Sequence, residues 1–204
     1  MAVIINASTS TGLVQSADTS GILEFQSNGT TKATLNSSGL AISQYNPSIS
    51  LVTSGTALAT TSNTSIDFTS IPSWVKRITV MFRGVSQNTS TTLILQIGSG
   101  GVTTSGYAST SSFIAPSTHI LNVTTGFPIN NSSGGGEAFS GLATICLLGS
   151  NTYCFSAVVA DTANAQNHFG AGSVVIGGAL DTVRLTTISG TATLDAGSFN
   201  ILYE

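Results

Sequence analysis

Apolar and polar residues alternate along most of this chain, and this period of two restricts its fold more than any other feature. In residues 75–83, Ile78, Val80 and Phe82 fall on one side of an extended strand, and the residues between them fall on the other. No helix-length window shows apolar residues at the i, i+3, i+4, i+7 spacing of an amphipathic helix. The sequence therefore predicts an all-β protein.

Residues 49–204 contain strand patterns separated by Gly, Asn and Ser turns, and we expect them to form one domain. The number of strands, about eight to ten, and their spacing are typical of an antiparallel β-sandwich or barrel. The clearest candidates are residues 75–83, 91–97, 139–148, 153–160, 173–176, 182–188 and 197–203.

Residues 1–48 differ, because their apolar residues come in short clusters between Ser, Thr, Asn and Gly. The pair Asn28-Gly29 predicts a two-residue hairpin, since both central positions of a type I′ turn need positive φ. We expect a second turn at Ser38-Gly39, and a junction with the following domain near Pro47, which interrupts strand pairing. Such short strands cannot close a core alone, so we expect an extended β-arm that packs on another chain.

The apolar side chains expected to pack this arm against its partners form one set. They are Leu13, Val14, Ile22, Leu23, Phe25, Leu35, Leu40 and Ile42. Only 6% of the chain is charged, compared with roughly a quarter in ordinary globular proteins. This scarcity indicates that much of the surface is covered by copies of the chain or by other proteins.

Charge and hydropathy exclude two classes of partner. The net charge of −3, the pI near 5.1 and a longest basic run of Lys76-Arg77 give no field that would attract nucleic acid. No apolar run approaches the roughly 18 to 20 residues that span a bilayer, and the first residues lack the charged and apolar regions of a signal peptide. We expect synthesis in the cytoplasm of the producing cell, and no membrane partner.

The chain offers little for catalysis. His119 and His168 are its two histidines, and it has no Gly-x-Ser-x-Gly elbow, His-Glu-x-x-His motif or phosphate-binding loop. Its carboxylates fall near expected turns, where Asp commonly makes local hydrogen bonds. His168 lies in DTANAQNHFG, which is interpreted as a polar surface loop, with an ion site as the alternative. We expect no enzymatic activity, cofactor or metal.

The stretch SIDFTSIPSWVKRITVMFRGVS holds the chain's one Trp and three of its five basic residues. We interpret it as a loop that enters a core strand, with Trp74 closing over one end of the core. Arg77 and Arg83 then lie on the solvent side. The alternative is a subunit interface in which Arg77 or Arg83 pairs with a neighbour's carboxylate.

Two further pairs of residues suggest local structure or binding. Cys146 and Cys154 flank a turn centred on Ser150, which would place them opposite each other as two small buried thiols rather than a disulfide. Tyr107 and Phe127 lie in long Gly/Ser/Thr loops. They are interpreted as local packing anchors or, together with His168, as receptor or glycan contacts.

The strings SIDFTSIPSWVKRITVMFRGVS, LQIGSGGVTTSGY and LDTVRLTTISGTATLDAGSFNILYE resemble a C-terminal β-sandwich domain of tailed-bacteriophage fibre and virion structural proteins. GILEFQSNGTTKATLNSSGLAI is similar to the intertwined β repeats of phage fibres and decoration proteins. The resemblance implies a homotrimer with wound N-terminal segments and projecting jelly-roll-like domains. It places the protein on the virion, with the major capsid protein or another virion protein as a partner.

The short N-terminal arm favours a capsid decoration or cement protein, or a short head fibre, over a long tail fibre. Two other functions stay open. One is a tail-fibre or lectin-like module that binds host-surface glycans through Tyr107 and Phe127. The other is a polysaccharide-degrading enzyme, which would need two carboxylates facing each other across a sugar.

Overall fold

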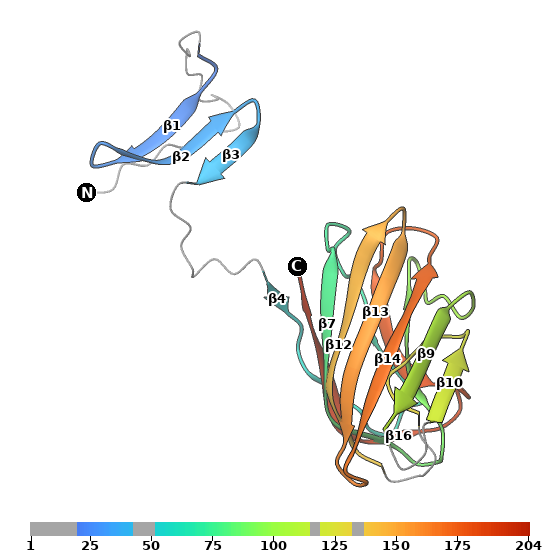
Figure 1. The fold of residues 1–204 in the computed structure, drawn as a ribbon. Helices are drawn as coiled ribbons and strands as arrows, with labels where there is room; N and C mark the ends of the chain where they lie inside the picture. The colour runs from blue at the N-terminus through green and yellow to red at the C-terminus, as the bar shows by residue number, and fades with distance from the viewer. Residues whose placement is uncertain (1–19, 43–51, 115–118, 132–136) are drawn as a thin grey trace. The chain divides into compact units, whose positions relative to one another are not determined.

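A computed structural model describes residues 20–42, 52–114, 119–131 and 137–204 of the chain. The chain divides into two compact units, Met1–Ser50 and Leu51–Glu204. All the regular structure of the described residues is β-strand, paired in antiparallel sheets (Figure 1). The prediction of an all-β fold with an antiparallel β-sandwich is confirmed.

The first unit contains a three-stranded antiparallel sheet in the order β1 (Leu23–Ser27), β2 (Thr30–Asn36) and β3 (Gly39–Ile42). Asn28 and Gly29 join β1 to β2 with φ of 52° and 72°, which confirms the predicted hairpin. The second turn is one residue earlier than expected. Asn36 pairs with Gly39, and the Asn36 Oδ1 accepts a hydrogen bond from the Ser38 N–H at 2.8 Å.

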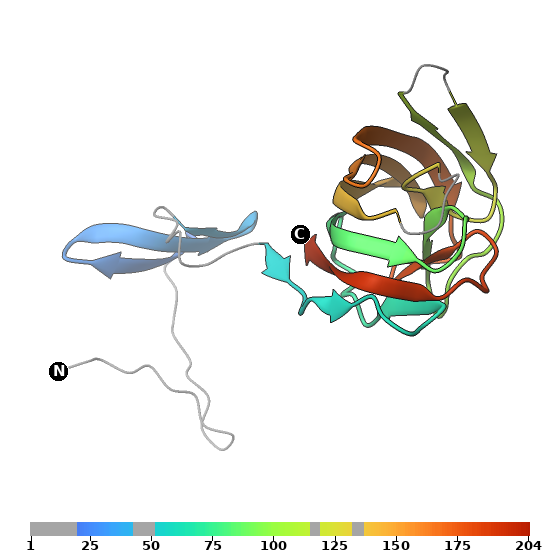
Figure 2. The same cartoon turned by 90° about the horizontal axis from the view of Figure 1, so that it is seen from below.

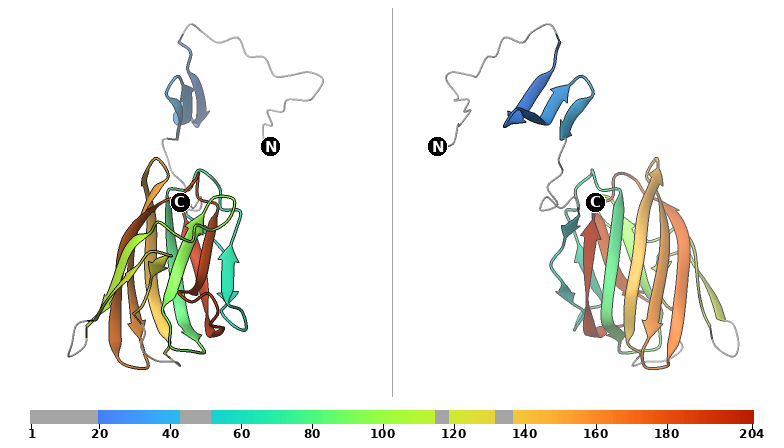
Figure 3. Two further views of the ribbon diagram at one scale, coloured as in Figure 1. Left: turned by 90° about the vertical axis from the view of Figure 1, so that its right-hand side faces the viewer. Right: turned by 60° about the vertical axis from the view of Figure 1, so that its left-hand side comes forward.

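The second unit is a sandwich of a nine-stranded and a four-stranded sheet, seen from other sides in Figures 2 and 3. The larger sheet has the order β10-β9-β14-β13-β12-β7-β16-β4, and β5 also pairs with β16. Its strands are β4 (Thr53–Ser54), β5 (Leu58–Ala59), β7 (Arg77–Gln87), β9 (Ala108–Phe113), β10 (His119–Val123), β12 (Phe139–Gly149), β13 (Thr152–Asp161), β14 (Gln166–Val175) and β16 (Leu194–Tyr203). The smaller sheet has the order β11-β8-β15-β6, formed by β6 (Ser65–Phe68), β8 (Leu93–Gly98), β11 (Phe127–Pro128) and β15 (Thr182–Thr187).

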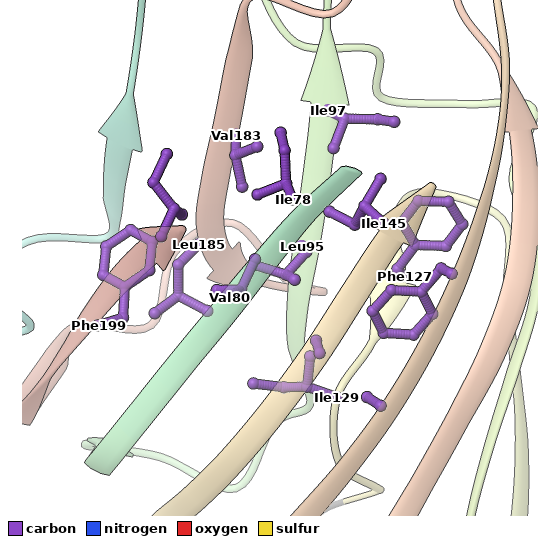
Figure 4. Close-up of a cluster of buried hydrophobic side chains, with 14 of the residues drawn as sticks. Ile78, Val80, Leu95, Ile97, Phe127, Ile129, Ile145, Val183, Leu185 and Phe199 are labelled. Atoms are coloured by element: carbon purple, nitrogen blue, oxygen red, sulfur yellow. The ribbon is translucent and has the colours of Figure 1, made fainter. Parts of the chain in front are cut away.

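The core lies between these two sheets. In β7, Ile78, Val80 and Phe82 are buried and the residues between them are exposed or half-buried, as the alternation predicts. Figure 4 shows labelled side chains of β7 and β12 from the larger sheet beside those of β8 and β15 from the smaller one. The hydrophobic cluster extends from Ile71 to Ile201, so the second unit contains its own core.

All residues of strand β8 are buried, and the chain just before β11 packs against it. The Gln96 Nε2 donates to the Thr125 carbonyl oxygen at 2.8 Å. A Cβ on Gly126 would lie 2.8 Å from Ile94 Cδ1, so glycine allows the backbone to approach this closely. The three consecutive apolar residues Leu93, Ile94 and Leu95 fit a strand that is buried on both faces.

Strand β14 begins at Gln166, whereas the sequence predicted a strand over residues 173–176 and a polar loop before it. The actual turn is short, since Asp161 pairs with Gln166 across it. Gly170 and Gly172 interrupt the alternation, and both lie against neighbouring chain: a Cβ on Gly170 would lie 2.3 Å from the Pro128 carbonyl oxygen. A strand pattern that depends on glycines for packing carries little hydropathy signal.

Candidate interaction surfaces

The sheet of the first unit has one apolar face. The pairing places Leu23, Leu35 and Leu40 in one row across the three strands. In the next row Phe25 is opposite Ala33, which is opposite Ile42. Paired residues of an antiparallel sheet share a face, so both rows lie on the same side.

This apolar face is exposed in the first unit. The exposed fractions are 40% for Leu23, 47% for Phe25, 46% for Leu35 and 61% for Leu40. Ile22, just before β1, is 47% exposed. The remaining residues predicted to pack the arm are Leu13, Val14 and Ile42. Leu13 and Val14 lie outside the described residues, and the side chain of Ile42 is not described.

The opposite face of the same sheet is polar. The Glu24 Oε2 accepts hydrogen bonds from Gln26 Nε2 at 3.0 Å and from Thr31 Oγ1 at 3.2 Å. Glu24 is also opposite Thr34 in the β1–β2 pairing. The sheet is therefore amphipathic, with water on one side and an apolar face that needs a partner on the other.

Arg77 and Arg83 lie on the outer face of the large sheet, and both are exposed. Arg77 forms an ion pair with Glu204 of its own chain. The backbone holds the two together, because the Arg77 N–H donates to the Glu204 carbonyl at 2.9 Å and the Glu204 N–H returns a bond at 3.0 Å. An interface role for Arg77 or Arg83 stays a prediction.

Trp74 does not close the core, and this prediction is wrong. Its side chain is 54% exposed and lies against Tyr203, with 6.0 Å between ring centroids. Ile71 and Val75 fill the end of the core instead, at 5% and 6% exposure. The Val75 N–H bonds the Pro72 carbonyl at 3.0 Å, and in this turn Trp74 lies outside while its flanking apolar neighbours are buried.

Tyr107 and Phe127 are buried at 2% and 0% exposure, so neither ring is accessible to a glycan. Their rings pack edge-to-face at 4.8 Å, and Phe127 also stacks on Phe155 at 4.6 Å. The Tyr107 hydroxyl accepts from the Ile97 N–H at 2.9 Å and lies 3.0 Å from the Thr103 carbonyl oxygen. Burial raises the pKa of Tyr107 to about 12. Both residues are packing anchors, which was the first interpretation, and the alternative of a stacking platform is wrong.

His168 is also buried, at 1% exposure, on β14 rather than in a surface loop. It packs against Phe113 and Phe139, with ring centroids 5.1 and 5.4 Å away. Its Nδ1 accepts from the Asn131 N–H at 3.1 Å, and its Nε2 is buried without a hydrogen-bond partner in the described structure. It is therefore not a receptor contact.

Burial lowers the pKa of His168, and the charge of Asp161 acts in the opposite direction. Asp161 is itself buried and braces the β13–β14 turn, accepting from the Ala163 N–H at 2.9 Å and from Asn164 Nδ2 at 2.7 Å. Among the residues that the structure describes, no three His, Cys, Asp or Glu side chains gather as a metal-binding group.

Cys146 and Cys154 pair directly across the β12–β13 hairpin, as predicted. The turn residues Ser150 and Asn151 both have positive φ, at 48° and 59°, as a type I′ turn requires. Both thiols are free. Cys154 is exposed, so the prediction that both are buried is wrong: its side chain lies on the outer face of the large sheet.

A polar groove on the smaller sheet was missed by the sequence reasoning. Gln96, Arg184 and Asp67 form one row across β8, β15 and β6. Arg184 donates to both carboxylate oxygens of Asp67, at 2.8 and 2.7 Å, and these bonds raise the pKa of the guanidinium. The groove has a volume of about 430 Å³ and is lined by Gln96, Arg184, several Thr and Ser side chains and Ile188. The one available signal was a single Arg between Val183 and Leu185 in a strand pattern.

No helix long and apolar enough to cross a membrane occurs in the described part of the chain. Comparison of the chain with protein-family models, with curated proteins and with solved structures finds no match. The function of the chain is therefore inferred from its own surfaces and side chains.

Proposed function

We propose that this protein is a non-enzymatic structural component of a tailed-bacteriophage virion. It is a homotrimeric capsid decoration protein or short head fibre, attached to the particle by its N-terminal arm. The β-sandwich unit projects from that arm. The protein assembles and attaches by burying apolar side chains and strand edges, and it catalyses no reaction.

The apolar face of the β1–β3 sheet is the observation that carries this proposal. Leu23, Phe25, Leu35 and Leu40 are 40–61% exposed on one side of a sheet that is polar on the other. Each fully buried side chain of this kind contributes roughly 1.5–3 kcal/mol, so the face favours association. Closed symmetry lets every copy bury the same face, and three copies around an axis leave none uncovered.

The composition and the sequence resemblance support the virion assignment. The chain carries 13 charged residues in 204, five basic and eight acidic, which is few for a protein surrounded by water. The strings that resemble phage fibre and virion proteins lie near the beginning and at the end of the second unit. Together they favour a building block over a free enzyme.

The native mass of the full-length protein tests the trimer. Light scattering should give about 62 kDa, three times the chain mass of 20.6 kDa, and the fragment 48–204 should lose that assembly. A monomeric full-length chain would overturn the trimer. Deleting residues 2–43 should then abolish incorporation into virions, and undiminished incorporation would refute the anchoring role of the arm.

A second candidate function, binding of neutral host-surface glycans, is favoured by the polar groove. Its Arg184 charge is already neutralised by Asp67, and its hydroxyl and amide groups suit a ligand with many hydroxyls rather than an anion. The Thr125 Oγ1 is buried beside Gln96 without a hydrogen-bond partner in the described structure. Glycan-array binding that is lost in Thr125→Val would support this function, and no binding by the wild-type protein would exclude it.

A further inference from the structure

A row in which five of the seven side chains are apolar crosses seven adjacent strands on the outer face of the large sheet. Register pairs connect its members one by one, from β16 to β10. The row, here called the outer stripe, consists of Asn200, Met81, Leu142, Val158, Phe169, Ser112 and Ile120. Its strands lie side by side in Figure 1.

The large side chains of the outer stripe are exposed. The exposed fractions are 53% for Leu142, 56% for Val158, 39% for Phe169 and 71% for Ile120. Scattered apolar residues are normal on a protein surface, but a contiguous series across neighbouring strands is typical of an interaction site. Because these residues alternate with the buried core positions, their exposure follows directly from the strand pairing.

One of the two rows beside the outer stripe carries no charge. The adjacent row along the same strands consists of Leu202, Thr79, Thr144, Ser156, Ala171, Thr110 and Asn122. On the other side, Arg83 of β7 is opposite Ser198 at one edge. A partner with charged groups at its centre would leave them desolvated and unpaired on this face. An uncharged partner of hydroxyl and aliphatic side chains fits it.

We propose that the outer stripe packs against the β-sandwich unit of a second copy of this chain. The inference rests on the proposed trimer. The chain itself supplies a surface of the required chemistry, since the residues of the same stripe are uncharged and mostly apolar. Contact between copies then buries two exposed apolar surfaces at once.

The arm makes such a contact favourable even if the outer stripe alone binds weakly. Residues 43–52 connect β3 to β4, and a segment of that length reaches at most about 36 Å at roughly 3.6 Å per residue. Arms held together by their apolar faces keep the sandwich units at an effective concentration on the order of millimolar. At this effective concentration, even a weak contact between two sandwich units is formed much of the time.

Paired cysteine probes test the inference. In a full-length background with Cys146→Ser and Cys154→Ser, one protein carries Val158→Cys in the outer stripe. Its matched control carries Ile188→Cys, at a position 41% exposed next to the opposite sheet. Labelling by a fluorescent maleimide should be at least tenfold slower at position 158 than at position 188. In the fragment 48–204, which contains the whole core, the two rates should become similar.

Each outcome bears on a distinct claim. Equal labelling of both probes in a protein of trimeric mass would overturn the outer-stripe contact and leave the trimer intact. A monomeric mass would overturn the trimer and the inference with it. Fast labelling of the free trimer, with slow labelling on the virion, would overturn the second copy as occupant and assign the stripe to another virion protein.

Discussion

Tyr107 shows how one hydroxyl group can hold a long loop. It joins the loop after β8 to the strand itself, because the Ile97 N–H donates to it at 2.9 Å and the Thr103 carbonyl lies 3.0 Å away. Composition alone could not reveal this. A Tyr among Gly, Ser and Thr looks the same whether its ring faces water or the core, and only the nonlocal contact with Phe127 distinguishes the two cases.

Tyr107→Phe should lower the free energy of unfolding by about 1–3 kcal/mol, because it leaves the buried Ile97 N–H without its acceptor. Urea denaturation followed by fluorescence measures the loss. Tyr203→Phe is the matched control and should change stability by less than about 0.5 kcal/mol, since that ring is only partly buried. Equal effects of the two variants would contradict the bracing role of Tyr107.

His168 makes stability depend on pH. Its pKa is lowered in the folded protein by burial, so below the unfolded value of roughly 6.5 the unfolded chain binds a proton that the folded chain does not. The stability is therefore fully present above about pH 6.5 and decreases as the pH falls, by at most about 1.4 kcal/mol per pH unit.

Urea denaturation at pH 7.5 and 5.5 measures this difference. His168→Gln should remove most of it, and His119→Gln, at an exposed ring stacked on Phe113, should retain it. The same pH dependence in wild type and His168→Gln would show that another group is responsible.

At the level of elements, local patterns predicted the strands that alternate strictly. The β7 pattern around Val80 and the Asn28-Gly29 hairpin are examples, because period two and positive φ are both encoded locally. Strand β9 and the first part of β14, before residue 173, escaped prediction for the opposite reason. Ser, Thr and Gly residues in them pack against neighbouring backbone, and such contacts depend on the whole fold.

Gly170 of β14 tests this explanation. Gly170→Ala would place a Cβ 2.3 Å from the Pro128 carbonyl oxygen of β11, so β11 and β14 must separate. We expect a loss of about 1–3 kcal/mol in unfolding free energy, the usual cost of overpacking. Gly177→Ala, with no atom within 4 Å, is the control and should be close to neutral. No loss in Gly170→Ala would mean that the two strands separate without cost.

The β1–β3 sheet offers an equally direct comparison between its two faces. Leu35→Lys puts a charge into the apolar row, and the cost of burying it should dissociate the proposed trimer to single chains at micromolar concentration. Thr34→Lys, one residue earlier and opposite Glu24, should leave the native mass unchanged. If both variants dissociated the protein, or if neither did, assembly would not depend on the apolar face of the β1–β3 sheet.

At the level of the whole molecule, the sequence predicted a surface that others must cover but not where that surface lies. The low charge content is a property of the entire chain. The residues of the outer stripe, in contrast, come together only when the seven strands pair in their register. Exposed Leu142 and Val158 are far from Met81 and Ile120 in sequence, and no local window contains the row. A conformation-dependent surface of this kind becomes visible only with the fold.

The two apolar faces should contribute to assembly in sequence, the arm first and the outer stripe second. Phe169→Lys charges the stripe at its centre, so we expect a particle that keeps the mass of about 62 kDa, three times 20.6 kDa, but has a larger radius of gyration by small-angle X-ray scattering. Leu35→Lys should instead reduce the mass to one chain. Val175→Lys, at 65% exposure near the end of β14 and outside the stripe, is the control and should change neither quantity. If Phe169→Lys alone yielded monomers, the order would be reversed, and the sandwich units rather than the arms would hold the copies together.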